Sequence, residues 1–258
     1  MKAVILCGGM GTRIRDVSEV IPKPMVPVGS QPIVWHIMKY YAHYGIKDFV
    51  LCLGYKKEAF IDYFLNYTHR NSDMTIELGA SPRTTLHSSN VSEDWRVTLA
   101  DTGLTTLTGG RLARVMRYLD ESTFMLTYGD GLCNIDIKAL LKCHRDGGKL
   151  ATVSAVHPAG RFGEIEMTGN RVTSFAEKPQ TTQGYINGGF MVLEKEFITK
   201  YIHDDSKCIL EADALVKCAH DGQLNAYCHD GFWQCMDTAR EHQMLNEMWE
   251  RGAIWKVW

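Results

Sequence analysis

The sequence predicts an α/β protein in which helices cover a mostly parallel β-sheet, with one small antiparallel excursion. Three observations lead to this prediction. Short apolar runs, each bounded by glycine or polar turns, recur along the 258 residues. Helical patterns lie between several of these runs, and one polar stretch interrupts the alternation. Alternating strand and helix patterns are typical of parallel sheets whose connections are helices.

The expected strands are short and apolar. They span Ala3 to Leu6, Phe49 to Leu53, Phe124 to Tyr128, Ala151 to Val156 and Gly189 to Leu193. Between the first two, apolar residues recur at helical spacing from Ile33 to Tyr44, and Gly45 follows as a helix-ending glycine. This segment is expected to be the helix that connects the two strands.

The interruption lies at about residues 71–108, where short alternating pieces such as Trp95 to Leu99 stand among Ser, Thr, Asn and Gly. We interpret it as an antiparallel excursion or lid-like loop inserted into one domain, 1–258. After Asp237 a helical pattern returns, and the apolar run from Ile254 to Trp258 is expected to be packed or to lie in a subunit contact of a homo-oligomer.

Composition narrows the class of protein. The hydrophobic content of 45% and the charged content of 22% are ordinary for a globular protein. The net charge of −2 gives no overall positive potential of the kind that attracts nucleic acid or an anionic membrane surface. The apolar run before Cys7 is too short for a signal peptide, and no stretch is long enough to span a membrane. The eight cysteines form no C-x-x-C pair, so we expect buried free thiols in the cytoplasm, with zinc as the alternative.

The first expected strand leads directly into a glycine-rich turn, Gly8 to Arg13. Backbone N–H groups in such a turn can approach phosphate oxygens, so a nucleotide is the natural ligand. The dinucleotide fingerprint G-x-G-x-x-G fails because Ile14 stands where a glycine or alanine is needed, and the P-loop pattern fails because no lysine follows at the required offset. The alternative is a plain tight turn between a strand and a helix.

Three further segments carry charge in constrained surroundings. Prolines flank Lys23 in P-K-P-M-V-P, which suits a clamp for an anion. Asp130 follows an apolar strand and stands between glycines, where ligands of an open α/β sheet bind. Asp237 is the second candidate carboxylate for Mg²⁺; its alternative role is a helix cap, but Thr238 and Glu241 already fit a capping box.

Two segments suit a ligand with hydroxyl groups. Glu177 and Lys178 precede a proline, and Asn187 precedes Gly188 and Gly189, which brings an amide and bare backbone together. Each segment alone is also consistent with an ordinary turn.

Together these motifs resemble the sugar-1-phosphate nucleotidyltransferases. They are, in order, L-C-G-G-M-G-T-R, P-K-P-M-V-P-V, Y-G-D-G, F-A-E-K-P, Y-I-N-G-G-F and G-F-W-Q-C-M-D-T. Within the family the chain looks most like the glucose-1-phosphate cytidylyltransferases. The marks of that subfamily are Pro32 to Met38, Trp95 to Leu99, Thr108 to Leu112, Gly160 to Gly163 and Trp255 to Trp258.

The resemblance implies a Rossmann-like fold and an enzyme that transfers a cytidylyl group from CTP to a hexose 1-phosphate, α-D-glucose 1-phosphate, with release of pyrophosphate. It implies a nucleotide site formed by Leu6, Gly8, Gly9, Gly11, Thr12 and Arg13, with Lys23 on the triphosphate and Arg111 as a weaker candidate. It implies Mg²⁺ held by Asp130 and Asp237, Lys178 on the sugar phosphate, and Glu177, Asn187 and Gly188 on sugar hydroxyls. The catalytic set is then Arg13, Lys23, Asp130, Lys178 and Asp237.

The sequence departs from the subfamily pattern on the sugar side. Residues Glu211 to Leu215 read E-A-D-A-L where relatives typically show E-x-E-P-L, and Cys235 stands where proline is common. Another NTP or sugar 1-phosphate is therefore the first alternative within the family. A non-catalytic regulator that binds a nucleotide sugar is the second; such a protein has no need of both metal carboxylates.

Overall fold

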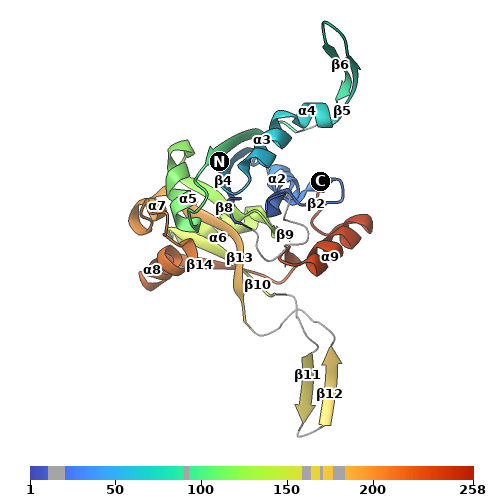
Figure 1. The fold of residues 1–258 in the computed structure, drawn as a ribbon. Coiled ribbons are helices and arrows are strands. Elements are labelled where there is room, and N and C mark those ends of the chain that lie inside the picture. The colour runs from blue at the N-terminus through green and yellow to red at the C-terminus, as the bar shows by residue number, and fades with distance from the viewer. Residues whose placement is uncertain (11–20, 90–92, 159–163, 169–170, 177–183) are drawn as a thin grey trace.

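The computed structural model describes residues 1–10, 21–89, 93–158, 164–168, 171–176 and 184–258. Within this part of the chain a central sheet of seven strands runs through the molecule (Figure 1). Across the sheet the strands are β14 (Leu224–His229), β10 (Ala151–Val156), β13 (Ile186–Glu194), β8 (Thr123–Tyr128), β1 (Lys2–Leu6), β4 (Asp48–Leu53) and β7 (Arg96–Asp101). Only β13 runs antiparallel to its neighbours, so the predicted mostly parallel α/β fold is confirmed.

Helices cover both faces of this sheet. The helical elements are η1 (Lys23–Met25), α2 (Ile33–His43), α3 (Lys57–Leu65), α4 (Tyr67–Arg70), α5 (Thr108–Val115), η2 (Met116–Tyr118), α6 (Ile137–Gly147), α7 (Lys195–Tyr201), η3 (Leu210–Leu215), α8 (Val216–His220) and α9 (Ala239–Glu250). In β1, Ala3 and Ile5 pack into a core shared with α2, α6 and α9, whereas Val4 and Leu6 pack into a core shared with α5, α7 and α8. Burial on both faces explains why the strand reads as a continuous apolar run.

The predicted connecting helix is confirmed. α2 begins at Ile33 and ends at His43, and Gly45 follows with φ +85°, a left-handed conformation that glycine adopts without strain. The strands that it connects, β1 and β4, pair in parallel.

Four small antiparallel pairs complete the described structure. They are β2 (Pro27–Val28) with β3 (Gln31–Pro32), β5 (Ser72–Glu77) with β6 (Arg83–Ser89), β9 (Gly131–Cys133) with β15 (Trp233–Cys235), and β11 (Glu164–Thr168) with β12 (Arg171–Ala176). The β5–β6 and β11–β12 hairpins project away from the central sheet on different sides (Figure 1).

The structure corrects one part of the sequence interpretation. The segment from Trp95 to Leu99 was expected to belong to the antiparallel excursion, but β7 is an edge strand of the central sheet and pairs in parallel with β4. Its sequence alternates polar and apolar residues because one face of this edge strand packs on the core: Val97 and Leu99 are partly buried there, whereas Arg96 is exposed. The antiparallel hairpin itself is limited to β5 and β6.

All eight cysteines lie in the described residues and are free thiols. Five of them are buried, as expected, whereas Cys228 is exposed. The apolar C-terminal run packs in part within the chain: Trp255 is fully buried and Ile254 is exposed. Among the helices of the described residues, none is long and apolar enough to cross a membrane.

Candidate active site

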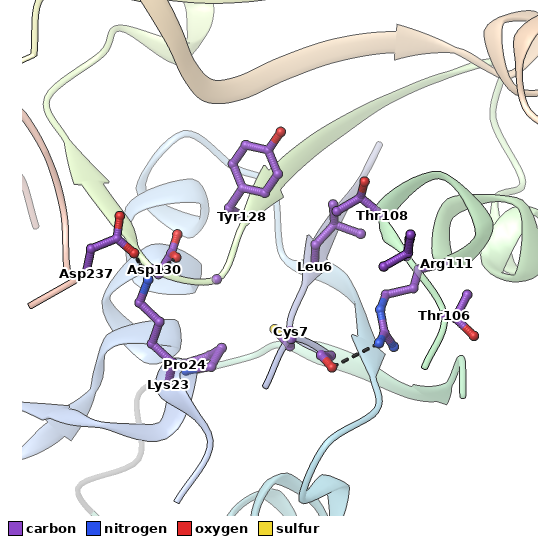
Figure 2. Close-up of a pocket in the computed structure, with 14 residues that line it drawn as sticks. Leu6, Cys7, Lys23, Pro24, Thr106, Thr108, Arg111, Tyr128, Asp130 and Asp237 are labelled. Carbon is purple, nitrogen blue, oxygen red and sulfur yellow. Dashed lines mark hydrogen bonds and ion pairs between the residues drawn. The ribbon is translucent and has the colours of Figure 1, made fainter. Parts of the chain in front are cut away.

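A cavity of about 320 Å³ lies at the carboxyl edge of the central sheet, where the neighbouring parallel strands β1 and β8 end. It is lined by Leu6, Cys7, Gly8, Gly9, Lys23, Pro24, Thr106, Leu107, Thr108, Arg111, Tyr128, Gly129, Asp130 and Asp237 (Figure 2). This edge is where ligands of open α/β sheets bind. Of the residues expected at the site, Leu6, Gly8, Gly9, Lys23, Arg111 and both aspartates line one cavity.

The glycine turn begins in this cavity. A Cβ on Gly8 would lie 2.0 Å from Nη1 of Arg111, so only glycine allows the guanidinium to pass so close. By contrast, a Cβ on Gly9 would meet no atom within 4 Å from the part of the chain that the structure describes. With respect to these residues, the backbone of Gly9 is open to the cavity that it lines. Gly11, Thr12 and Arg13 lie outside the described residues.

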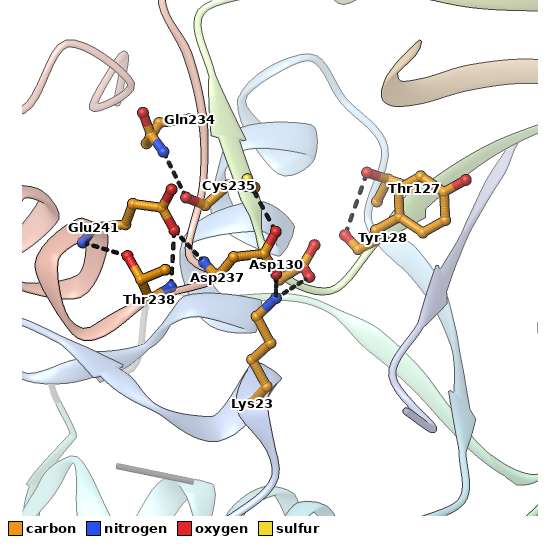
Figure 3. Close-up of polar contacts among 9 residues, drawn as sticks. All are labelled: Lys23, Thr127, Tyr128, Asp130, Gln234, Cys235, Asp237, Thr238 and Glu241. Atoms are coloured by element: carbon orange, nitrogen blue, oxygen red, sulfur yellow. Dashed lines mark hydrogen bonds and ion pairs between the residues drawn. The ribbon is translucent and has the colours of Figure 1, made fainter. Parts of the chain in front are cut away.

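Lys23 lies at the start of the 3₁₀ turn η1, which Pro22 precedes. The turn buries the side chain and directs its Nζ to two carboxylates, at 2.5 Å from Oδ2 of Asp130 and 2.5 Å from Oδ1 of Asp237 (Figure 3). Burial alone lowers the pKa of Lys23, but the charges and hydrogen bonds of the two aspartates outweigh it, so the pKa is raised. The lysine is therefore a fixed cation at the cavity wall.

The two carboxylates come together through a local β pair. Asp130 follows β8 and precedes β9, and Asp237 follows β15; β9 and β15 pair with Gly131 opposite Cys235. The N–H of Met236 also donates to the carbonyl oxygen of Asp130 at 2.9 Å. This pairing places two aspartates that are distant in the sequence on either side of Lys23.

The N-terminus of α9 does not use the Asp237 carboxylate as its cap. Thr238 is the N-cap: its hydroxyl accepts from the N–H of Glu241 at 3.3 Å, and Glu241 accepts from the N–H groups of Thr238 and Asp237 (Figure 3). The predicted capping box is confirmed. The Asp237 carboxylate instead faces Lys23 and accepts from the thiol of Cys235 at 3.6 Å, while burial raises the pKa of Cys235 to about 12.

The carboxylate pair fits Mg²⁺ better than a metal that needs a full protein cage. In the residues that the structure describes, no group of three His, Cys, Asp or Glu side chains could hold a metal ion. Mg²⁺ is usually held by one or two carboxylates together with waters and substrate phosphates. Two oxygen donors beside an open cavity satisfy that requirement.

Arg111 lies in α5 on the opposite side of the cavity from the aspartates (Figure 2). Its guanidinium donates to the carbonyl oxygens of Gly8 at 2.9 Å, Leu53 at 3.0 Å and Gly103 at 2.9 Å, and to the hydroxyl of Thr102 at 2.7 Å. Burial lowers the pKa of this arginine. These bonds hold the backbone around the glycine turn, and a direct contact between Arg111 and the nucleotide stays a prediction.

The expected sugar side lies next to the cavity, on β13. Asn187 is exposed and its Oδ1 accepts from the N–H of Gly189 at 2.9 Å. The carbonyl oxygen of Gly188 accepts from the indole N–H of Trp233 at 2.7 Å. Neither residue lines the cavity itself, but the ring of Tyr128 packs against Gly189 and joins the two regions. Glu177 and Lys178 lie outside the described residues.

Sequence reasoning did not assign several residues of the cavity wall. Thr106, Leu107 and Thr108 lie at and just before the start of α5, and Tyr128 ends β8. Tyr128 stands in Y-G-D-G and Thr108 in T-G-G-R-L, so both belonged to motifs that were recognised as wholes. Nothing in the spacing of these motifs indicates which of their side chains face the ligand.

Comparison with known proteins identifies the family of the chain. The profile of the nucleotidyl transferase family matches residues 2–250, so the chain belongs to this family of enzymes. The chain is 47% identical over 260 aligned positions to the glucose-1-phosphate cytidylyltransferase of Salmonella typhimurium, with both chains fully covered. It is 40% identical over 259 positions to the probable glucose-1-phosphate cytidylyltransferase of Bacillus subtilis, again with full coverage. The family resemblance predicted from the motifs is confirmed.

Solved structures agree with the fold. HddC from Yersinia pseudotuberculosis superposes with a TM-score of 0.67 at 26% identity, covering 96% of this chain and 99% of that one. A UDP-glucose pyrophosphorylase complexed with UDP-glucose superposes with a TM-score of 0.67 over 97% of this chain and 98% of that one, at 15% identity. The second likeness bears on the fold alone.

Proposed function

We propose that this chain transfers the cytidylyl group of CTP to a hexose 1-phosphate, α-D-glucose 1-phosphate, giving CDP-glucose and pyrophosphate with Mg²⁺. The observation that carries the proposal is the approach of Lys23 to both Asp130 and Asp237 beside the glycine turn. A fixed ammonium and a pair of carboxylates are the groups that a triphosphate and its metal require. The names of the relatives that match over the full length support CTP and glucose 1-phosphate as the substrates.

The reaction needs no nucleophile from the protein. A phosphate oxygen of the sugar phosphate attacks the α-phosphorus of CTP, a new P–O bond forms, and the bond from that phosphorus to the bridging oxygen of pyrophosphate breaks. The chain contributes orientation and charge, which are the main sources of acceleration in phosphoryl transfer. Lys23 would stabilise the negative charge that develops on the leaving pyrophosphate.

Asp130 and Asp237 would hold Mg²⁺, which when bound offsets charge on the phosphates of the nucleotide. Leu6, Gly8 and Gly9, together with Gly11 and Thr12, would hold the nucleotide and its phosphates, and Arg13 would offset charge on the leaving pyrophosphate. Arg111 would hold the backbone of Gly8 in place. Lys178 would bind the phosphate of the acceptor, and Glu177, Asn187 and Gly188 would bind its hydroxyls. In this division the donor would occupy the cavity that Tyr128 lines, and the acceptor would bind near Asn187 and Gly188.

We also infer a cytoplasmic homo-oligomer. All eight cysteines are free thiols, as is usual in reducing compartments. Large apolar side chains gather in exposed positions on the β5–β6 hairpin, where Ile76 is 55% exposed and Leu78 is 90% exposed, and such patches commonly lie in interfaces. Light scattering of the purified protein tests the inference, and a monomer at micromolar concentration contradicts it.

The decisive experiment measures pyrophosphate release for CTP, UTP, dTTP and GTP, each against several hexose 1-phosphates. CTP with glucose 1-phosphate should give the highest kcat/KM. Lys142 forms an exposed ion pair with Asp146, and neither residue lines the cavity, so Lys142→Met is the control for loss of an ammonium outside the site. Another hexose phosphate used about ten times more efficiently, a difference of about 1.4 kcal/mol, would remove glucose from the proposal and leave the enzyme class intact.

A further inference from the structure

Glu211 makes two hydrogen bonds with the cavity wall although it does not line the cavity. The hydroxyl of Thr108 donates to Oε2 of Glu211 at 2.7 Å, and the phenol of Tyr128 donates to Oε1. Both hydroxyls belong to residues that line the cavity. One half-buried carboxylate therefore accepts the protons of two hydroxyl groups in the wall.

The position of Glu211 is fixed by its own helix. Glu211 lies in η3, a π-helical turn, a rare element that is frequent at functional sites. The N–H of Leu210 donates to the hydroxyl of Thr108 at 2.9 Å, which joins η3 to the start of α5. A Cβ on Gly109 would lie 2.6 Å from Sγ of Cys208, so the two elements pack closely. The carboxylate cannot easily move away from the wall.

Tyr128 carries this constraint to the sugar side. Gly189 has φ +83°, and a Cβ there would lie 2.4 Å from Cδ2 of Tyr128, so the phenol ring packs directly against this glycine. The N–H of Gly189 in turn donates to Oδ1 of Asn187 at 2.9 Å. The Asn187 amide is therefore joined to Glu211 through Gly189 and the ring of Tyr128.

We propose that Glu211 is a positioning residue for the acceptor sugar, which acts through Tyr128 to fix the orientation of the Asn187 amide. The inference rests on the proposed function, in which Asn187 binds a sugar hydroxyl. With its single proton donated to Glu211, the phenol of Tyr128 is held with its ring against Gly189. Because Gly189 holds Oδ1 of the exposed Asn187, the amide can present its NH₂ group to a hydroxyl oxygen of a hexose.

A glutamine in place of Glu211 cannot serve both hydroxyls. Its side chain has one carbonyl oxygen and one NH₂ group, so either Thr108 or Tyr128 faces a donor instead of an acceptor. If the phenol loses this acceptor, its ring is no longer held against Gly189, and the Asn187 amide loses its orientation. Tyr128→Phe removes the phenol oxygen while it keeps the ring that packs on Gly189.

The test compares KM values for glucose 1-phosphate and CTP in Glu211→Gln, Tyr128→Phe, Asn187→Ala and the double variant Tyr128→Phe with Asn187→Ala. Each of the first three should raise the KM for the sugar phosphate about tenfold and leave the KM for CTP within about twofold. In the Asn187→Ala background, Tyr128→Phe should add almost nothing, because the two residues act as one unit. Glu194→Gln is the control: Glu194 accepts a threonine hydroxyl at 2.7 Å but lies outside the cavity lining.

Thermal unfolding shows whether each variant is folded. If Glu211→Gln is unstable, Tyr128→Phe still tests the proposal, because it removes the same hydrogen bond from the other side. Equal increases in both KM values, or full additivity of Tyr128→Phe and Asn187→Ala, would overturn the proposal. Wild-type turnover is measured first, so failure of the proposed function is recognised separately. In that case calorimetric binding of CDP-glucose to the same variants still reports on Asn187, and unchanged affinity in all three single variants contradicts the positioning role.

Discussion

The two ends of α9 lie in opposite kinds of buried environment. At its N-terminus Asp237 and Asp130 share the ammonium of Lys23, so three charged groups are held together. At its C-terminus Trp249 packs edge-on against the buried ring of His36, with ring centroids 4.7 Å apart, and Trp255 lies beside both. The comparison shows two solutions within one helix: at one end opposite charges face each other, and at the other end a titratable ring is held neutral.

The aromatic end enforces neutrality on His36 by geometry. Nε2 of the ring lies 2.8 Å from the carbonyl oxygen of Val28 and donates to it, and Nδ1 accepts from the indole N–H of Trp255 at 3.5 Å. Burial lowers the pKa of His36 to about 4, against the raising effect of the backbone hydrogen bonds. A proton on Nδ1 would meet the indole N–H of Trp255, which is a donor, and the two would repel.

The largest effect should come from Asp237→Asn at the charged end. Asparagine has nearly the same size, and the cap belongs to Thr238, so the fold should be retained. Loss of a carboxylate from the proposed metal pair should lower kcat/KM by about 1,000-fold or more, roughly 4 kcal/mol of transition-state stabilisation. Mg²⁺-dependent turnover and melting temperature are the measurements; a fully active variant would leave Asp130 as the only defensible protein ligand.

Lys23→Met should have the next largest effect. Methionine keeps the apolar stem of the side chain but removes the ammonium, so Asp130 and Asp237 face each other without a counter-ion. We expect a loss of about 100-fold in kcat/KM, close to 3 kcal/mol, with weaker calorimetric binding of CTP than of the sugar phosphate. Lys178→Met should weaken chiefly the sugar phosphate. Equal loss of affinity for both ligands in both variants contradicts this division.

The aromatic end can be tested through pH. Because the pKa of His36 is lower in the folded chain than in the unfolded chain, the unfolded state binds more protons below about pH 6.5, and stability falls as pH falls toward 4. Between pH 7 and pH 5 the expected loss is about 2 kcal/mol of unfolding free energy. Urea unfolding of the wild type and of His36→Gln at both pH values measures it. An equal decrease in the two proteins assigns the pH dependence to other groups.

The smallest effect should come from Thr238→Ala, which removes the cap and leaves the Asp237 carboxylate in place. Loss of a capping hydroxyl costs about 1 kcal/mol, or a decrease of about 2–4 °C in melting temperature for a chain of this size. Turnover should stay near that of the wild type. A large loss of activity without a loss of stability would show that the cap serves the carboxylate more than the helix.

The sequence predicted those parts of the fold that local patterns determine. The strand β1 and the helix α2 were recognised because continuous apolar runs and helical spacing reflect burial directly. β7 was assigned to the wrong sheet, because an exposed edge strand alternates in the same way as a strand of an antiparallel hairpin. Pairing partners are set by tertiary contacts, and the pattern of one segment does not contain them.

For the candidate site, motifs identified Lys23, Asp130 and Asp237, because rigid or glycine-flanked charges are unusual outside functional sites. The hydrogen bonds between Glu211 and Tyr128 could not be predicted in the same way. These two residues are 83 positions apart in the chain, and no local sequence pattern around either of them indicates that they are in contact. The E-A-D-A-L departure drew attention to this segment, but only the structure connects it to the cavity wall.

Arg111 has a consequence for how the molecule opens. Its guanidinium binds the carbonyl oxygens of Gly8 after β1, Leu53 at the end of β4 and Gly103 after β7. Separation of any one of these strand ends leaves a buried cation short of acceptors, which costs more than a neutral hydrogen bond. The edge strand β7 should therefore not fray by itself: its amide hydrogens should exchange with solvent together with those of β1 and β4, as one cooperative unit that includes the start of the nucleotide turn.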